Sequence, residues 1–173
     1  RMNKGDTIMM ISKKMAAALN EQVKNEFFAY WTYLQMSYTF NSMGLSVFST
    51  WYHQQAIEEQ AHAMKIADYL LDQGAEVELL SLDKPKADYK SAEEVGQAAL
   101  DHEIKVTKQI NDHASPAREE HDHATENFLQ YYIQEQVEEV ATATELLDLV
   151  KMSDSTGQLL MLENRIMALR TEG

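Results

Sequence analysis

Hydrophobic residues recur along most of this chain at steps of three and four positions. Such steps place apolar side chains on one face of an α-helix and are typical of helices packed side by side in a bundle. We predict five helices, over residues 12–41, 46–73, 92–118, 122–152 and 158–169. Residues 1–10 form an N-terminal extension, and residues 1–173 are predicted to form a single domain.

The connection over residues 75–91 is the longest irregular stretch, with Pro85 inside it. Its 17 residues can reach at most ~56 Å at ~3.3 Å each. The 28 residues of the second predicted helix span only ~42 Å at ~1.5 Å each. The connection can therefore return along the whole bundle. We predict an all-α fold, namely a four-helix bundle with a long crossover between the second and third helices and a short fifth helix.

Composition agrees with an all-helical chain and excludes several functions. There are two prolines, six glycines and no cysteine, which excludes disulfides and thiolate metal sites. The formal net charge of −13 argues against nucleic acids and anionic membranes as partners and favours cations. Residues 27–57 lack charged side chains, but polar residues interrupt them before the roughly 18 apolar residues of a membrane span are reached. We see no signal peptide and expect a cytoplasmic protein.

A glutamate lies near the middle of each long predicted helix, in line with the apolar residues. These glutamates are Glu26, Glu59, Glu103 and Glu139. The midpoints of packed helices of similar length coincide whichever way each helix runs, so we expect the four carboxylates to converge in the core. His62 follows Glu59 by three positions, which puts both side chains on one helix face, one turn apart.

Four buried carboxylates repel one another, and each is costly to remove from water. Two divalent cations would cancel the four charges, and a Glu-x-x-His unit such as Glu59 and His62 is the helical half of a di-metal carboxylate site. Oxygen and imidazole ligands suit iron, with manganese and zinc as competitors. The alternative is that each glutamate is solvated, as most are. Four glutamates in register with a partnered histidine favour the metal site.

Two further residues are predicted to serve this centre without binding metal. Tyr33 lies two turns after Glu26, near enough to donate a hydrogen bond or an electron, although a core tyrosine without such a role is the alternative. Gln136 lies one turn before Glu139, and we interpret it as a hydrogen-bond donor to the ligands.

Three more glutamates, Glu58, Glu135 and Glu138, flank the predicted centre. Together they suggest a further cation position beside the first two, and a solvated acidic edge is the alternative. Residues 119–123 combine three acidic side chains with two histidines. That stretch is a polar turn in the simplest interpretation and the lining of a metal-conducting pore in the other.

At these motifs the chain resembles the bacterial non-haem ferritins. The resemblance covers about residues 11–169 and includes residues 20–22 followed by Glu26, the run 58–62, the pair 102–103 and, most specifically, residues 128–139. It implies a ferritin-like subunit that assembles into a homo-oligomeric cage, typically of 24 copies. It also implies iron storage and detoxification, in which Fe(II) is oxidised by dioxygen or hydrogen peroxide and stored as a ferric mineral.

The resemblance also implies roles for individual residues. Glu26, Glu59 and His62 would hold the first of two irons per subunit, and Glu59 would bridge to the second. Glu103 and Glu139 would complete the second position. Residues Glu58, Glu135, Glu138 and Glu139 match a third, flanking iron site, and Tyr33 matches the family's tyrosine near the centre.

Two departures separate the chain from the haem-containing bacterioferritins. Gln60 stands where their haem methionine follows the bridging glutamate, and residues 136–139 supply no histidine for a second Glu-x-x-His. We therefore expect no haem, and a rubrerythrin-like peroxidase would also need that second histidine. The remaining alternative is a non-catalytic cage subunit or helical scaffold, which should have lost part of the ligand set. The set is intact here, so we predict a ferroxidase.

Overall fold

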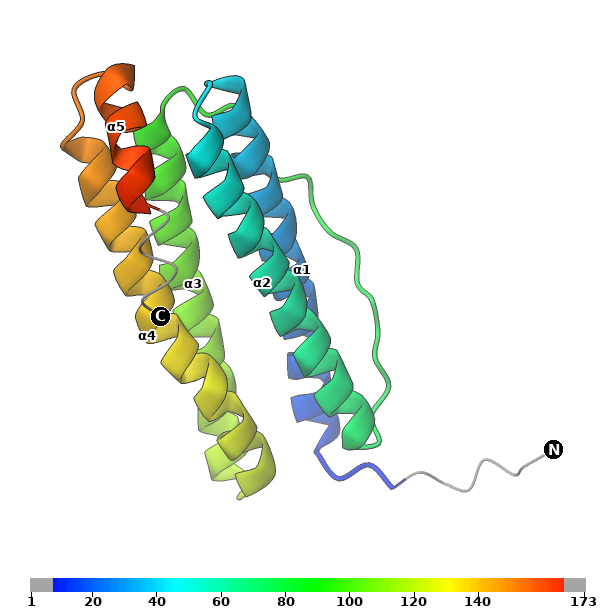
Figure 1. Ribbon diagram of the computed structural model, residues 1–173. Coiled ribbons are helices and arrows are strands. Elements are labelled where there is room, and N and C mark those ends of the chain that lie inside the picture. The colour runs from blue at the N-terminus through cyan, green and yellow to red at the C-terminus, as the bar shows by residue number, and fades with distance from the viewer. Residues whose placement is uncertain (1–7, 167–173) are drawn as a thin grey trace.

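A computed structural model describes residues 8–166 of the chain, which form five helices and, within that range, no strand. Four long helices lie side by side: α1 (Lys13–Ser42), α2 (Ser46–Asp72), α3 (Ala92–Glu119) and α4 (His123–Lys151). The short α5 (Thr156–Ile166) packs against α2 and α4 at one end of the bundle (Figure 1). The predicted all-α bundle with a long crossover and a short fifth helix is confirmed.

The four long helices begin and end within one residue of the predicted limits. The fifth begins two residues earlier than expected, because Gly157 lies inside its first turn rather than before it. Part of the predicted extension (1–7) and the predicted end of the last helix (167–169) lie outside the described residues.

Side-chain caps mark where three of the long helices begin. The hydroxyl of Ser12 accepts a hydrogen bond from the Met15 amide at 3.0 Å, and that of Ser91 accepts one from the Glu94 amide at 3.1 Å. Asp122 caps α4 in the same way. Ser91 and Glu94 form a variant of the capping box, in which the Glu94 carboxylate accepts from the Lys90 amide rather than from that of Ser91.

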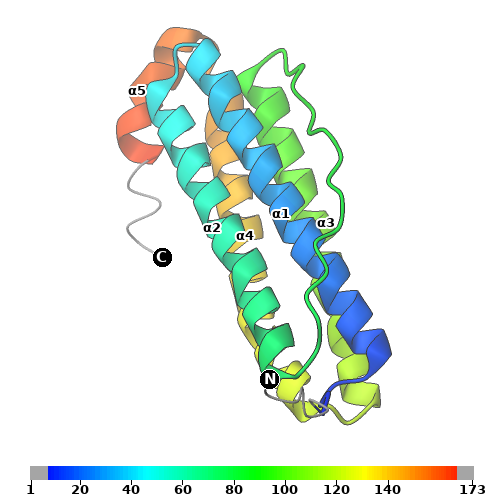
Figure 2. The same ribbon diagram turned by 90° about the vertical axis from the view of Figure 1, so that its right-hand side faces the viewer.

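The crossover between α2 and α3 runs along the outside of the bundle, beside α1 (Figures 1 and 2). It places the start of α3 at the same end as the start of α2, so these two helices run in parallel. The side chain of Asn20 on α1 holds the crossover near its beginning. Its amide nitrogen donates to the carbonyl of Glu76 at 3.0 Å, and its oxygen accepts from the amide of Glu78 at 2.7 Å.

The hydrophobic core consists of two separate clusters, one in each half of the bundle. One gathers apolar residues from the end of α1, the starts of α2 and α3 and the end of α4, with Phe40 and Phe48 stacked at its centre. The other gathers the start of α1, the ends of α2 and α3 and the start of α4 around Leu19, Ile66 and Ile110. Buried polar residues occupy the middle of each helix between them.

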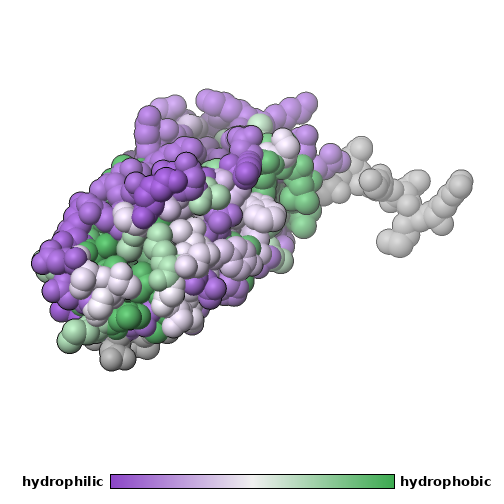
Figure 3. All heavy atoms as spheres, turned by 90° about the horizontal axis from the view of Figure 1, so that it is seen from above, coloured by the Kyte–Doolittle hydropathy of each residue, from purple (hydrophilic) through white to green (hydrophobic). Residues whose placement is uncertain are grey.

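Some large apolar side chains remain on the surface of the single chain. On the face seen from above, hydrophobic residues lie between hydrophilic ones (Figure 3). On α2, exposed apolar residues recur every seven positions at Ile57, Met64 and Leu71, and on α1 Trp31 and Tyr38 have the same spacing. Within residues 8–166, every helix is too short or too polar to cross a bilayer.

The Asn20 contact with the crossover generates a test of the fold. Replacing Asn20 with Ala removes three hydrogen bonds, two of them to the crossover, from a side chain that is 8% exposed. We expect the free energy of unfolding to fall by about 1–3 kcal/mol, and the amide of Glu78 to exchange its hydrogen faster. Hydrogen-exchange mass spectrometry of the crossover measures this. Asn111→Ala, on the exposed side of α3, is the control, and unchanged exchange at Glu78 would contradict the assignment.

Candidate metal centre

The four mid-helix glutamates and His62 lie together between the two apolar clusters. Ligand atoms of Glu26, Glu59 and His62 lie within 4.8 Å of one another, and so do those of Glu59, Glu103 and Glu139. Glu59 belongs to both groups. Glu26, Glu59 and Glu103 are at most 2% exposed, and His62 is 7% exposed. The structure thus brings together all five residues that the sequence placed at the centre.

Glutamine side chains orient two of the carboxylates from one turn away on the same helix. Gln22 donates from Nε2 to Oε1 of Glu26 at 2.6 Å, and Gln55 donates from Nε2 to Oε1 of Glu59 at 2.8 Å. Gln55 also reaches Oε2 of Glu139 on α4 at 2.9 Å, which joins two carboxylates through one amide group.

Glu103 is held by residues from two other helices. The hydroxyl of Tyr33 donates to Oε1 of Glu103, and Gln136 donates to its Oε2 over 3.4 Å. Gln136 therefore serves Glu103 rather than its neighbour Glu139. Thr107 in turn donates to Oε1 of Gln136 at 2.9 Å, which fixes the orientation of that amide.

The imidazole of His62 presents its two nitrogens to different carboxylates. Nδ1 lies 3.5 Å from Oε2 of Glu59, and Nε2 lies 3.8 Å from Oε2 of Glu135. The rings of Tyr131 and Tyr132 pack edge-on against it. The hydroxyl of Tyr132 donates to the backbone carbonyl of His62 at 2.9 Å. Nδ1 is thus the nitrogen that faces the paired ligand groups.

Burial dominates the electrostatics of the cluster. It raises the pKa of Glu103 and of Glu139 to about 8, with the charge of Glu59 adding to the effect in both. Burial and the charge of Glu59 also raise the pKa of Glu26 well above its ordinary value. Without metal, burial therefore favours the protonated forms of these three carboxyl groups.

Glu59 and His62 form the ionised pair within the cluster. Burial opposes the charge on Glu59, but its hydrogen bond and ion pair with His62 outweigh burial and lower its pKa. Burial likewise opposes the charge on His62, yet the same contact with Glu59 raises the pKa of the imidazole. The residue that both groups share is thus the carboxylate most readily ionised.

The donor atoms fit hard or borderline divalent cations. Oε2 of Glu26 is buried and has no hydrogen-bond partner among residues 8–166, which leaves it available to a cation. Four carboxylates and one imidazole are the ligand types that iron, manganese and zinc accept. His102 precedes Glu103 in the sequence. Its Nε2 atom is also buried and has no hydrogen-bond partner in the described part of the chain.

The flanking glutamates are placed differently from the central ones. Neither of the two close groups contains Glu58, Glu135 or Glu138, and Glu58 and Glu138 are exposed. Glu135 is partly buried and approaches Nε2 of His62. A third cation position at these residues therefore stays a prediction. So does a pore at residues 119–123, which cover the last residue of α3, the turn and the first residue of α4.

Sequence reasoning missed most of the residues that support the ligands. Gln22 and Gln55 carried a signal, because each precedes its glutamate by four positions, the spacing at which side chains of one helix meet. Thr107 carried none, since its role depends on which face of α3 meets α4.

Fold and site together define a four-helix bundle with a cluster of four carboxylates and one histidine at its centre that could hold metal ions. The Ferritin family, described as a ferritin-like domain, matches residues 16–153. The chain is 37% identical over 147 residues to the ferritin BfrB of Mycolicibacterium smegmatis, covering 85% of this chain and 80% of that protein. It is 34% identical over 158 residues to a bacterial non-heme ferritin of Staphylococcus aureus, covering 91% and 95%.

Solved structures agree with this assignment. The open-pore ferritin of the hyperthermophilic archaeon Archaeoglobus fulgidus superposes with a TM-score of 0.88 at 37% identity, covering 91% of this chain and 97% of that one. An engineered closed form of the same ferritin superposes with a TM-score of 0.87 at 38% identity, covering 90% and 96%. The chain therefore belongs to the ferritin family of iron-storage proteins.

The raised pKa values predict how the stability of the metal-free protein depends on pH. The folded chain keeps protons on Glu103 and Glu139 that the unfolded chain releases above about pH 4.5. We therefore expect the free energy of unfolding to fall as pH rises from about 4.5 to 8, by up to about 1.4 kcal/mol per pH unit for each extra proton held.

The variant Glu103→Gln should flatten this dependence and raise the melting temperature above pH 8, where the parent buries a charge at this position. Calorimetry of chelator-treated protein at several pH values tests it, with the exposed Glu119→Gln on the same helix as the control. A lower melting temperature for Glu103→Gln above pH 8 would contradict the buried cluster.

Proposed function

We propose that this chain is a ferroxidase subunit that oxidises Fe(II) inside the bundle and stores it as ferric mineral. The observation that carries the proposal is the pair of close ligand groups that share Glu59. A site of this kind binds two cations side by side, with one carboxylate available to both.

Each ligand has a distinct role in the proposal. Glu26 and His62 bind the first iron, Glu103 and Glu139 bind the second, and Glu59 bridges the two. The imidazole enters through Nδ1, the nitrogen next to Glu59. Gln22, Gln55 and Gln136 hold the carboxylates in place through their amide nitrogens, and Tyr33 holds Glu103.

Iron is the substrate, and its binding exchanges charge for protons. Protons on the buried carboxyl groups leave when two Fe(II) ions arrive, so the four carboxylates become ionised only with compensating charge beside them. Oxidation then removes one electron from each Fe(II) and passes it to dioxygen or hydrogen peroxide. The anionic ligand set favours Fe(III) over Fe(II), which lowers the energy of that step.

The proposed assembly is a closed homo-oligomeric cage, typically of 24 copies in the family that the sequence resembles. Exposed apolar stripes on α1 and α2 support it, because patches of this kind are unusual on monomers. Only a hollow assembly offers an interior for the mineral. The alternative, a non-catalytic subunit or scaffold, is not favoured, since such a chain has no need for five converging ligands.

A third iron position beside the pair is a finer proposal. Glu135 contacts His62, and Glu58 and Glu138 lie at neighbouring positions on α2 and α4. With Glu139 they offer oxygen ligands on the flank of the second iron. Occupancy there would let a third Fe(II) contribute an electron in step with the pair.

Removal of the shared ligand Glu59, or of its neighbour His62, tests the dinuclear site. We expect Glu59→Ala and His62→Ala to slow oxidation of the first two Fe(II) per subunit at least 100-fold, because the first variant removes the ligand common to both irons and the second removes a ligand of the first iron. Stopped-flow absorbance under air measures the rate. Sedimentation should show the parent and both variants as the same large assembly; parent-like rates would place the chemistry elsewhere, and a 19.8 kDa monomer would contradict the cage.

The flanking position has its own test in the double variant Glu135→Ala/Glu138→Ala. The first two irons should still oxidise quickly, since their ligands are intact. The oxygen-to-iron ratio and the recovery of fast oxidation on a second iron addition should both change. Sequential-addition stopped-flow with oxygen uptake compares the variant with the parent. Identical traces would contradict the proposed third site without affecting the evidence for the dinuclear site.

A further inference from the structure

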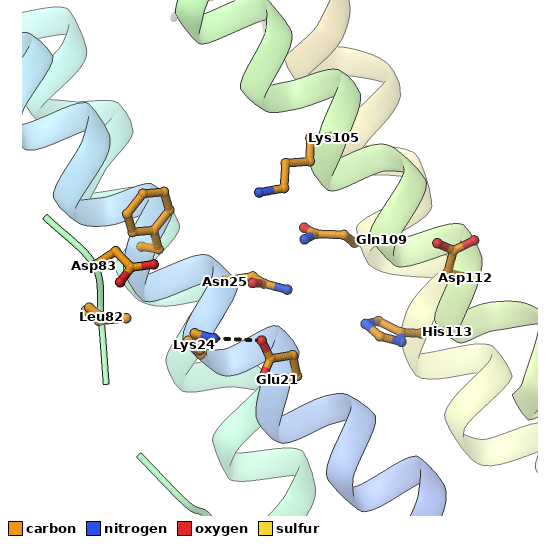
Figure 4. A pocket seen from close by; sticks show the side chains of 10 residues that line it. Glu21, Lys24, Asn25, Leu82, Asp83, Lys105, Gln109, Asp112 and His113 are labelled. Atoms are coloured by element: carbon orange, nitrogen blue, oxygen red, sulfur yellow. Dashed lines mark hydrogen bonds and ion pairs between the residues drawn. The ribbon is translucent and has the colours of Figure 1, made fainter. Parts of the chain in front are cut away.

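A pocket of about 470 Å³ lies outside the metal centre, between α1, α3 and the crossover. Lys24 comes from α1, Asp83 from the crossover, and Lys105, Gln109 and His113 from α3 (Figure 4). The imidazole of His113 points across the gap toward α1. None of these residues belongs to the two ligand groups.

His113 connects this pocket to the metal centre through one buried residue. Its Nε2 lies 3.1 Å from Oε1 of Gln22, and Nε2 of Gln22 donates to Oε1 of Glu26 at 2.6 Å. Gln22 is completely buried, so no solvent can replace either partner. The other oxygen of Glu26 has no hydrogen-bond partner in the described part of the chain.

Chemistry fixes the direction of both hydrogen bonds. In the ionised form that binds metal, the Glu26 carboxylate can only accept hydrogen bonds, so the amide nitrogen of Gln22 must face it, as it does here. The amide oxygen then faces His113, which must donate its Nε2–H. Asn25 also approaches this oxygen, but over 3.5 Å, so His113 is the main donor. Burial lowers the pKa of His113, which leaves the ring neutral with one N–H to give.

We propose that His113 is a positioning residue that sets the orientation of the Gln22 amide and thereby holds the Glu26 side chain in place as a ligand for the first iron. Without its donor, the Gln22 amide can turn over, and Glu26 then loses the hydrogen bond that orients it. The inference rests on the proposed ferroxidase function and adds a specific control of the first metal position from a residue on α3.

A matched pair of variants isolates the N–H donor from the shape of the side chain. His113→Phe keeps a planar ring and removes the donor, whereas His113→Gln supplies an N–H at a position close to that of Nε2. Gln109→Ala is the control, since it alters the same pocket and contacts neither Gln22 nor Glu26 in any hydrogen bond. Circular dichroism and sedimentation check that all three variants fold and assemble.

The first readout is metal binding without turnover. Co(II) replaces Fe(II), resists oxidation in air, and reports its ligand geometry through visible absorption bands. We expect His113→Phe to weaken binding of the first Co(II) about tenfold and to shift its bands, while the second Co(II) and the variants His113→Gln and Gln109→Ala stay close to the parent. Equal affinities and spectra for the Phe, Gln and parent proteins would overturn the proposal.

The second readout separates positioning from a general loss of activity. For oxidation, the Fe(II) concentration at half-maximal rate should rise about tenfold in His113→Phe, with little change in the limiting rate. In a Gln22→Leu background, His113→Phe should have no further effect, because the connection is already broken. Independent, additive effects of the two substitutions would overturn the proposal.

Failure of the underlying function gives a different result. If Co(II) binding to the parent is insensitive to Glu59→Ala and His62→Ala, the dinuclear site itself is wrong, and the role of His113 falls with it. If those variants abolish binding while His113→Phe matches the parent, only the positioning role is wrong.

Discussion

The burial of four carboxylates in one layer is the constraint on which the rest of this structure depends. Each helix contributes an acidic side chain at its middle, and nothing apolar can replace the compensation that those charges need. The metal-free chain supplies that compensation with protons, one histidine and three glutamine amides. In the proposed function, iron binding substitutes metal charge for protons within the same framework. Stability and function therefore draw on one set of residues.

The supporting residues show why the layer holds its geometry. Glu26 and Glu59 are each fixed from their own helix, while Glu103 is fixed from α1 and α4. Gln55 joins α2 to Glu139 on α4. Because the contacts of Glu103 and Glu139 cross between helices, the positions of these two carboxylates depend on how the neighbouring helices pack.

Periodicity and spacing were sufficient to predict the fold and the residues that converge. The recurrence of hydrophobic residues at steps of three and four positions located the helices. The length of residues 75–91 distinguished the crossover from a short loop. The partners of the ligands were harder. Gln136 was expected to act at the centre, but its actual acceptor, Glu103, depends on the rotation of α3 against α4. His113 and Thr107 likewise became visible only when distant helix faces met.

The division of the core into two apolar clusters has a mechanical consequence. Phe40 and Phe48 close one half of the bundle, and Leu19, Ile66 and Ile110 close the other, so neither half relies on apolar packing through the middle. Spreading the helices slightly at mid-height exposes polar groups that water can solvate, whereas spreading them at either end would expose hydrocarbon. The middle of the bundle is thus the part where a small separation of the helices costs the least free energy.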